Sequence, residues 1–346
     1  MRIAVVTSSP PMSEGGHLVI ARSLVTALGA AGHEAEIVVT PQNRFGRQAS
    51  AYLATWLTDV GSSDGRPIDR IISLRYPSYA VRHPHHVCWL NHTMREYYDL
   101  WERFSVTLTP RGRMKESIRR RLIHAADHYL LARNVKRLFV QSRTIQDRLR
   151  IWPRLQSQVL YPPAPPRNYR CEDYGDYIFM VSRLTELKRA ELLVRALAVP
   201  AGAGIRAVIA GEGEEQARLE HLIAITNLEG RVTLAGRLSE DAILEHLSRC
   251  RAVCFPPLGE DYGFVTVEAF ASQKAVITCR DSGGPTELVG DGQHGFVCDP
   301  TPEALADALR RVAKDRTLAE RLGRQALARG AELTWPHTVA TLLAVN

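Results

Sequence analysis

The chain has 346 residues, 45% of which are hydrophobic, and a formal net charge of +7. This length favours two domains over one core, and the sequence has no run of about 18 apolar residues that could span a membrane as a helix. The charge is uneven, because residues 1–165 hold 23 Lys and Arg against 12 Asp and Glu, whereas the remaining residues hold 21 against 25. The basic first half indicates an anionic partner, such as a membrane surface or a lipid phosphate. Nucleic acid is not expected, because zinc-finger, RNP and helix-turn-helix patterns are missing.

The N-terminal segment predicts a β-α-β unit. Residues 1–8 read as a buried strand, and Ser and Pro interrupt them too soon for a signal peptide. A loop with Gly15 and Gly16 follows, then an apolar-periodic helix over His17–Ala31 and a second strand over Ala35–Thr40. Strand, glycine-containing loop, helix and strand form the β-α-β pattern. The two glycines are consistent with a simple turn or with a loop near a ligand, and the sequence leaves both open.

The next segment predicts a histidine at the end of a buried strand. After a helix around 51–60, two short apolar strands are predicted over Arg70–Leu74 and Val87–Leu90, as in buried parallel sheets. The second strand leads into His92, which would lie at the carboxyl edge of a parallel sheet. The alternative is that His92 only caps a following helix over Met94–Leu100.

Two other groups of residues could suggest a metal site or disulfides, but neither has the required spacing. His83, His85 and His86 lie on one predicted loop without a carboxylate or a helical spacing, so we interpret them as surface residues. Cys250 and Cys254 are four positions apart, but no second pair or histidine spacing follows. Reduced cytosolic thiols are therefore expected for the six cysteines.

Residues 111–121 are strongly basic, since six of these eleven residues are Lys or Arg. Met114, Ile118 and Leu122 recur every four positions and predict one apolar stripe on a basic helix. Such a helix can lie on an anionic membrane, or the stripe can pack on its own domain. A second helix is predicted over 124–134.

The clearest domain boundary is the segment 161–166, Tyr-Pro-Pro-Ala-Pro-Pro. Four prolines among six residues cannot continue a helix or a strand, and they favour a stiff extended connection. A strand over Arg137–Ser142 and a helix over Thr144–Ile151 are predicted just before it.

A second β-α-β series begins at residue 177. Tyr177–Val181 is a predicted strand that opens into a turn with Arg183 and Lys188, followed by a helix through Leu197. Two cations at a strand–helix junction suit a diphosphate. Both residue types are also common on surfaces, so this pair alone leaves the question open.

Further strands are predicted over Arg206–Ala210 and Val232–Arg237. The first ends in Gly-Glu-Gly at 211–213, but the third glycine of a dinucleotide fingerprint is missing, and no acid lies on the next strand about 20 residues on. This argues against a nicotinamide site. Ser239 is predicted to cap a helix that ends at Arg249.

The most informative stretch is Leu258–Phe270, which places Glu260 and Glu268 eight positions apart. Two prolines end the strand-like residues 251–255 before it, and a helix is predicted to begin near Phe264. Glu260 would then lie on a loop at a strand's carboxyl end, where open α/β sheets bind ligands, and Glu268 near a helix N-terminus. As an alternative, the two acids merely cap the helix.

The rest of the chain predicts the end of this second sheet. A strand over Ala275–Thr278 precedes a double-glycine turn at 283–284, which would expose backbone donors at a helix start. A last strand is predicted over Gly295–Cys298, followed by helices over 302–332 and one after Trp335.

The two acids, the aromatic-Gly-Phe insert between them and the Val-Glu-Ala-Phe ending resemble the E-x7-E signature of retaining glycosyltransferases with the GT-B fold, usually called family 4. Residues 182–188 are similar to that family's Gly/Ser-Arg-Leu-x-x-x-Lys signature. The resemblance is specific over most of the C-terminal half and loose over the N-terminal half. It implies an α/β fold of two doubly wound, Rossmann-like domains facing a cleft. The expected division is an acceptor domain over 1–160, a linker over 161–176, a nucleotide-sugar domain over 177–332 and a C-terminal segment, 333–346, that crosses back to the first domain.

The resemblance implies roles for the charged residues. Arg183 and Lys188 would hold the donor's pyrophosphate and stabilise the leaving group, as metal ions do in other enzymes. Glu260 would hold the donor sugar, and Glu268 would accept hydrogen bonds from ribose hydroxyls. His92 would contact the sugar or the diphosphate. The residues expected to be catalytic are Glu260, Arg183, Lys188 and His92.

The resemblance also implies a set of residues that bind substrate largely through their backbone. The glycine pair in the first loop would lie near the donor phosphates and the acceptor, and the turn after residue 236 would lie near the base. These further substrate-binding residues are Gly15, Gly16, Gly211, Arg237, Leu238, Tyr262, Gly263, Phe264 and Val265.

The sequence therefore predicts a retaining glycosyltransferase that moves a sugar from a UDP-, GDP- or similar nucleotide sugar to a sugar, lipid-linked or small-molecule acceptor. No D-x-D motif occurs, and no metal or other cofactor is expected. A cytoplasmic protein is expected, with peripheral contact to the inner face of a membrane through 111–121. The alternative is a non-catalytic scaffold that binds nucleotide sugars. A nicotinamide dehydrogenase is disfavoured by the missing fingerprint.

Overall fold

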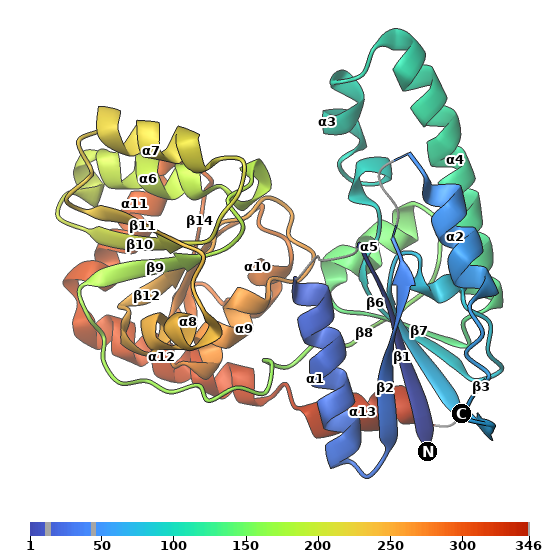
Figure 1. Cartoon of the computed structure of the whole chain (residues 1–346). Coiled ribbons are helices and arrows are strands. Elements are labelled where there is room, and N and C mark those ends of the chain that lie inside the picture. Colours follow the sequence, from blue (N-terminus) through green and yellow to red (C-terminus); the bar gives the residue numbers. More distant parts are fainter. Residues whose placement is uncertain (11–14, 43–45, 345–346) are drawn as a thin grey trace. The chain divides into compact units, whose positions relative to one another are not determined.

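The computed structural model describes residues 1–10, 15–42 and 46–344. The chain forms two compact units (Figure 1): unit 1 comprises Met1–Pro165 and Thr334–Asn346, and unit 2 comprises Pro166–Leu333. The boundary between Pro165 and Pro166 lies inside the predicted linker. Unit 2 is thus inserted into unit 1, which is built from two separate parts of the chain.

Unit 1 is built on a sheet of six strands in the order β2-β1-β5-β6-β7-β8. All pairings between neighbouring strands of this sheet are parallel. The inner strands are buried and apolar, because helices cover both faces of such a sheet. The strands are β1 (Arg2–Ser9), β2 (Glu34–Pro41), β5 (Arg70–Arg75), β6 (His86–His92), β7 (Arg137–Val140) and β8 (Gln158–Val159), with a separate hairpin of β3 (Ser62–Ser63) and β4 (Arg66–Pro67).

The helices of unit 1 are α1 (Gly16–Ala30), α2 (Gln48–Leu57), α3 (Trp101–Val106), α4 (Pro110–Arg133), α5 (Arg143–Ile151) and α13 (Trp335–Leu343). The alternative of a helix over Met94–Leu100 is wrong. That segment contains one short 3₁₀ turn, Arg95–Tyr97, and the α-helix begins later, at Trp101.

Helix α4 is continuous from Pro110 to Arg133, where the sequence predicted a basic helix and a separate second one. The Thr109 side chain caps it by accepting a hydrogen bond from the Gly112 N–H at 3.2 Å, and Pro110 occupies the first helical position. The two predicted helices merge because residues 113–133 contain neither Gly nor Pro, so nothing breaks the helix between them.

Helix α13 belongs to unit 1, although it follows unit 2 in the chain. The indole Nε1 of Trp335 donates a hydrogen bond to the carbonyl oxygen of Ala164 at 2.9 Å. Its ring meets the buried ring of Trp89 edge to face, with 6.2 Å between centroids. At the other end of the helix, Arg70 donates to the carbonyl oxygen of Leu342 at 3.2 Å. The two ends of α13 are therefore tied to the sheet of unit 1.

A buried carboxylate lies in the aromatic core of unit 1. Asp127 of α4 is fully buried and accepts hydrogen bonds from the hydroxyls of Tyr52, Tyr79 and Tyr98. Burial raises the pKa of Asp127 to about 6, although the three hydroxyls oppose this shift.

Unit 2 is built on a second parallel sheet of six strands, in the order β11-β10-β9-β12-β13-β14. Counted along the chain, this is the order 3-2-1-4-5-6 of the doubly wound Rossmann fold. The order reverses between β9 and β12, which makes the gap between their carboxyl ends the switch point. The strands are β9 (Tyr177–Val181), β10 (Arg206–Ala210), β11 (Val232–Gly236), β12 (Ala252–Cys254), β13 (Val276–Cys279) and β14 (Gly295–Cys298).

Helices cover both faces of this sheet: α6, α7 and α11 lie on one face, and α8, α9 and α12 on the other (Figure 1). The predicted cap of α8 is confirmed, since the Ser239 side chain accepts from the Ala242 N–H at 3.2 Å. The predicted class of two doubly wound α/β units is confirmed. The helices are α6 (Ala190–Ala198), α7 (Gln216–Ile225), α8 (Glu240–Arg249), α9 (Phe264–Ala271), α10 (Gly284–Leu288), α11 (Pro302–Lys314) and α12 (Arg316–Ala331).

Candidate functional site

The candidate residues of unit 2 lie at the carboxyl edge of its sheet, around the switch point. Arg183 and Lys188 follow β9, and Glu260 follows β12, the neighbouring strand. The loops after these strands are tied together, because the Leu258 N–H donates to the carbonyl oxygen of Leu187 at 2.8 Å. Open α/β sheets bind ligands at this position.

Lys188 and Glu260 form an ion pair, with 2.5 Å between Nζ and Oε2. Lys188 ends a 3₁₀ turn, Glu186–Lys188, and its Nζ also lies 5.5 Å from the centroid of the Phe255 ring. Both side chains of the pair are largely buried, with 14% and 22% exposed. A cation and an acceptor are thus held together at the switch point.

The backbone of Glu260 is fixed by the loop that follows β13. The N–H of Glu260 donates to the carbonyl oxygen of Ser282, and the carbonyl oxygen of Glu260 accepts from the Gly284 N–H, each at 2.8 Å. Gly283 has a φ of +72°, and a Cβ there would lie 2.5 Å from the carbonyl oxygen of Glu260. The double glycine is therefore required for the two loops to approach.

Arg189 is part of this site, although sequence reasoning did not assign it a role. Its guanidinium donates to the carbonyl oxygens of Pro256 and Pro257 at 2.7 and 2.8 Å, and it pairs with Asp281 at 2.6 Å. It also adopts a left-handed backbone with φ 53°. Arg189 thus holds the turn after β9 against the loop after β12. No local pattern distinguishes such an arginine from a surface one.

Arg183 is exposed and lies on the turn after β9. Backbone hydrogen bonds join this turn to the turn after β10, and that turn to the end of β11. The Leu184 N–H donates to the carbonyl oxygen of Glu212 at 2.9 Å, and the Gly211 N–H donates to the carbonyl oxygen of Gly236 at 2.7 Å. Gly211 has a φ of +133°, and a Cβ there would lie 1.8 Å from the carbonyl oxygen of Ser182. A glycine is therefore needed at 211 to bring these turns together.

The turn after β11 contributes the two residues predicted near the base. Arg237 is exposed and Leu238 is half-buried, directly after Gly236, which has a φ of +64°. They lie on the same sheet edge as Arg183, beyond Gly211.

The segment 262–265 forms the start of α9. Gly263 precedes the helix with a φ of +81°, and a Cβ there would lie 2.7 Å from the Phe255 ring. The first N–H groups of a helix have no partner within the helix, so Phe264 and Val265 present backbone donors at this edge. Tyr262 is buried against Gly284. This part of the site therefore offers amides rather than side chains.

Glu268 lies one turn into α9 and is buried. It pairs with Nη1 of Arg167, whose Nη2 lies 3.0 Å from Oε2 of Glu240 at the start of α8. Burial raises the pKa of Glu268, and the charge of Arg167 opposes this shift. The neighbouring Tyr169 phenol also has a raised pKa, through burial and then the charge of Glu268. Sequence analysis did not identify Arg167 or Tyr169, because both lie about a hundred positions away in the predicted linker.

The remaining candidates lie on unit 1. Gly15 precedes α1 and Gly16 is its first residue, whereas residues 11–14 of the same predicted loop lie outside the described residues. His92 is the last residue of β6 and is half-buried, and its carbonyl oxygen accepts from the Tyr76 N–H at 3.1 Å. The structure thus places these three residues at the carboxyl end of the sheet of unit 1.

The prediction that His86 lies on the surface is wrong. His86 is the first residue of β6 and is fully buried, with its Nε2 2.7 Å from Oγ of Ser73. Burial lowers the pKa of His86 to about 3. The strand begins one residue earlier than predicted and carries the histidine into the core, whereas His85 is exposed.

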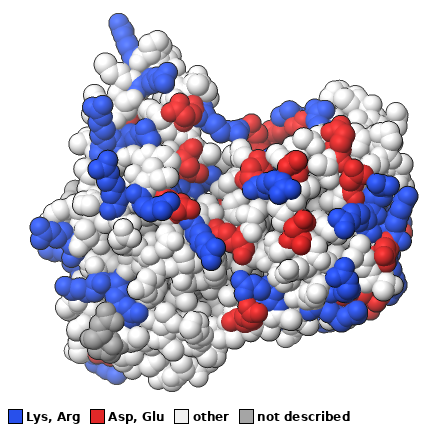
Figure 2. All heavy atoms as spheres, turned by 180° about the vertical axis from the view of Figure 1, so that it is seen from behind, with Lys and Arg blue, Asp and Glu red and all other residues white. Residues whose placement is uncertain are grey.

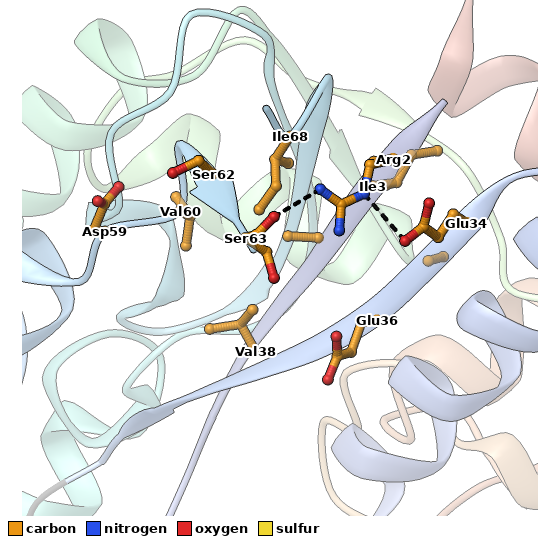
Figure 3. Close-up of a pocket in the computed structure, with 12 residues that line it drawn as sticks. Arg2, Ile3, Glu34, Glu36, Val38, Asp59, Val60, Ser62, Ser63 and Ile68 are labelled. Atoms are coloured by element: carbon orange, nitrogen blue, oxygen red, sulfur yellow. Dashed lines mark hydrogen bonds and ion pairs between the residues drawn. The ribbon is translucent and has the colours of Figure 1, made fainter. Parts of the chain in front are cut away.

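Within residues 1–10, 15–42 and 46–344, no group of three or more His, Cys, Asp or Glu is arranged to hold a metal ion. The six cysteines are free thiols. A cavity of about 400 Å³ lies on unit 1 at the amino ends of β1 and β2, where Arg2 donates to Glu34 and to the carbonyl oxygen of Ser63 (Figure 3). It is lined by none of the candidate residues and lies at the edge of the sheet opposite to His92.

Residues 169–329 match the family model described as "Glycosyl transferases group 1". This match lies entirely within unit 2 and includes its candidate residues from Arg183 to Glu268. Unit 2 is thus similar to the group 1 glycosyltransferases.

Curated relatives match just under half of the chain. The alpha-D-kanosaminyltransferase of Streptomyces kanamyceticus is 33% identical over 153 residues, which are 43% of this chain and 39% of that protein. The D-inositol 3-phosphate glycosyltransferase of Nocardia farcinica is 31% identical over 176 residues, which are 48% of this chain and 39% of that protein. The matched part of the chain thus spans 39% of the length of each of these two relatives.

Solved structures match both units. Sucrose-phosphate synthase from Thermosynechococcus elongatus has a TM-score of 0.78 at 18% identity, covering 98% of this chain and 97% of that one. Anabaena HepE in complex with UDP has a TM-score of 0.68 at 18% identity, covering 99% of both chains. WaaG, a glycosyltransferase involved in lipopolysaccharide biosynthesis, has a TM-score of 0.71 at 15% identity, covering 99% of this chain and 100% of that one. These likenesses confirm the predicted GT-B fold.

Proposed function

We propose that this protein is a group 1 glycosyltransferase of family 4 that moves a sugar from a nucleotide-diphosphate sugar to an acceptor hydroxyl, with retention of the anomeric configuration. The observation that carries this proposal is the Lys188–Glu260 ion pair at the switch point of unit 2, inside the segment that matches the family model. A dehydrogenase is not favoured, because the turn after β10 lacks the dinucleotide fingerprint.

In this proposal, Arg183 and Lys188 bind the pyrophosphate of the donor. As the bond to the sugar breaks, negative charge develops on the diphosphate, and the two cations stabilise that charge more in the transition state than in the ground state. The backbone N–H groups of Phe264 and Val265 add donors at the same edge. This scheme requires no metal ion and no other cofactor.

The carboxylates orient the two ends of the donor. Glu260 accepts hydrogen bonds from the hydroxyls of the transferred sugar, so the anomeric carbon is held beside the diphosphate. Glu268 accepts from the ribose hydroxyls, and the turn at Arg237 and Leu238 contacts the base. His92 of unit 1 binds the sugar or the diphosphate. The acceptor attacks from the side of the leaving group, and a phosphate oxygen takes its proton.

We propose that the acceptor side of the reaction takes place at an anionic membrane on the cytoplasmic side. Met114, Ile118 and Leu122, here called the α4 stripe, are 65%, 55% and 66% exposed on unit 1, so they do not pack on their own domain. Arg111, Lys115 and other cations of 111–121 lie beside them on the same helix. Lys and Arg side chains gather along the projecting part of unit 1 (Figure 2). Apolar side chains flanked by cations suit a surface of anionic lipids. Among the helices described, none is long and apolar enough to cross a membrane.

The proposal is tested with the purified chain and a panel of nucleotides. UDP, GDP and ADP are screened by thermal shift, since a ligand at a hundred times its dissociation constant adds about 2.7 kcal/mol to stability. The matching nucleotide sugars are then tested for transfer and hydrolysis, and NMR of the product reads the anomeric configuration. Turnover with retention supports the proposal. Binding without turnover would identify a nucleotide-sugar-binding scaffold, and an inverted product would exclude the retaining mechanism.

A further inference from the structure

We infer that Arg167 is a positioning residue that holds Glu268 in the orientation in which its carboxylate accepts hydrogen bonds from the ribose of the donor. This inference rests on the proposed function, which assigns the ribose to Glu268. Arg167 is the second residue of unit 2 and lies in none of its helices or strands.

The contacts show how Arg167 acts on Glu268. Its Nη1 pairs with Oε1 of Glu268, and its Nη2 lies 3.0 Å from Oε2 of Glu240. The guanidinium is therefore fixed from two sides, by α9 and by the first residue of α8. The side chains of Arg167 and Glu268 are only 16% and 10% exposed. Because Nη2 is held by Glu240, the rigid guanidinium presents Nη1 at a fixed place and so restrains the position of Oε1 of Glu268.

The charge of Arg167 also favours the ionised form of Glu268, which is the form that accepts hydrogen bonds. A buried carboxylate without a cation takes up a proton, and a protonated carboxyl group offers a donor where the ribose hydroxyls need acceptors. The charged and titratable groups that face Glu268 are Arg167 and Tyr169 from the segment before β9, and Glu240 from α8. Of these, Arg167 is the cation, and its contribution lowers the pKa of Glu268 against the effect of burial.

The same segment offers a matched control. Arg170 lies three positions further on and also pairs with α8, through Glu245 at 2.6 Å, but not with Glu268. Its side chain is 45% exposed. Removing the charge of Arg170 thus removes a similar tie between this segment and α8 without changing the surroundings of Glu268.

The experiment compares UDP, GDP and ADP with their 2′,3′-dideoxy forms, which lack the ribose hydroxyls. In the wild-type protein, the nucleotide that binds should lose about tenfold to a hundredfold in affinity when its hydroxyls are removed, since hydrogen bonds to a charged group are the stronger ones. Glu268→Gln and Arg167→Met should each reduce this ratio to less than about threefold. Arg167→Lys should retain part of it, and Arg170→Met should keep the wild-type value.

The pH dependence gives an independent readout. Without Arg167, Glu268 takes up its proton at higher pH, so the affinity of Arg167→Met for the ribonucleotide should begin to fall at a higher pH on acidification than that of the wild type. A role that is only structural would lower the melting temperature without moving this pH or the ratio for the dideoxy form.

The outcomes distinguish the role of Arg167 from the proposed function itself. If Glu268→Gln loses the discrimination and Arg167→Met keeps it, the inference about Arg167 is wrong and the proposed function stands. If the wild-type protein binds no nucleotide of the panel, or if Glu268→Gln keeps the wild-type ratio, the ribose site itself is wrong and the inference is overturned with it.

Discussion

Lys188 and Glu260 are 72 positions apart in the chain, and their side chains meet at 2.5 Å. Lys188 lies after β9 and Glu260 after β12, the two strands between which the sheet order of unit 2 reverses. The proposed function assigns Lys188 to the diphosphate of the donor and Glu260 to its sugar. The groups that would bind these two parts of the donor are therefore in direct contact with each other.

Removing the ammonium of Lys188 should slow transfer. We expect Lys188→Ala to lower kcat by about a hundredfold to a thousandfold, as the loss of one fixed group that stabilises developing negative charge does in other enzymes. Steady-state kinetics with the donor found by the nucleotide screen measures this. The control is Lys314→Ala, because Lys314 is an exposed lysine at the end of α11. An equal effect of both variants would contradict the role of Lys188.

The close approach of the loops after β12 and β13 should not tolerate a side chain at Gly284. A Cβ at this position would lie 2.5 Å from the Cα of Tyr262, whereas a Cβ at Gly230 would meet nothing within 4 Å. Neither glycine has a positive φ, so the pair differs in space rather than in backbone strain. We expect Gly284→Ala to destabilise unit 2 by about 1–3 kcal/mol, and Gly230→Ala to be neutral or slightly stabilising. Thermal unfolding followed by circular dichroism measures both, and similar melting temperatures would contradict the tight approach.

The α4 stripe should bind anionic vesicles. We expect the wild-type protein to sediment with vesicles of phosphatidylcholine and phosphatidylglycerol, and not with phosphatidylcholine alone. Ile118→Glu should weaken this binding by about tenfold or more, because it removes apolar contact and adds a repelled charge. Ile225→Glu is the matched control, since Ile225 is 61% exposed on α7 of unit 2, compared with 55% for Ile118. Loss of vesicle binding in both variants, or in neither, would show that the stripe is not the contact.

Asp127 should make the stability of unit 1 depend on pH. Its pKa is about 6 in the folded chain and about 3.9 in an unfolded chain. Between these values the folded state binds the additional proton, so the free energy of unfolding should fall as pH rises from 4 to 6, by about 3 kcal/mol at most. Asp127→Asn should remove this part of the slope, whereas Asp307→Asn, which changes an exposed carboxylate on α11, should keep it.

Urea unfolding followed by tryptophan fluorescence measures this slope. All five tryptophans lie in unit 1, at positions 56, 89, 101, 152 and 335, so the signal reports on this unit. An unchanged slope in Asp127→Asn would show that the buried carboxylate does not titrate in this range.

The elements of unit 2 could be predicted from local patterns. Short apolar runs such as Tyr177–Val181 and Gly295–Cys298 are followed directly by polar residues, and both strands have the predicted bounds. Glu260 could be placed for the same reason, because the loop that follows a parallel strand lies at the carboxyl edge of the sheet.

The contacts that fix the site could not be predicted in this way. Arg167 pairs with Glu268 across 101 positions, and Arg189 pairs with Asp281 across 92, so neither pairing leaves a local signal. His86 was misplaced because one residue at a strand end decides between loop and core. The long α4 was split in the prediction, since its apolar positions are too sparse to show one periodicity over 24 residues.

The insertion of unit 2 into unit 1 has a consequence for how the protein is made. Residues 334–344 leave the ribosome after all of Pro166–Leu333, and with them comes Trp335, whose ring contacts Trp89. During synthesis, unit 2 is therefore the first of the two units to have all of its residues available for folding. Until α13 has been synthesised, residues 1–165 lack the helix that completes unit 1, and the residues that contact α13 remain uncovered.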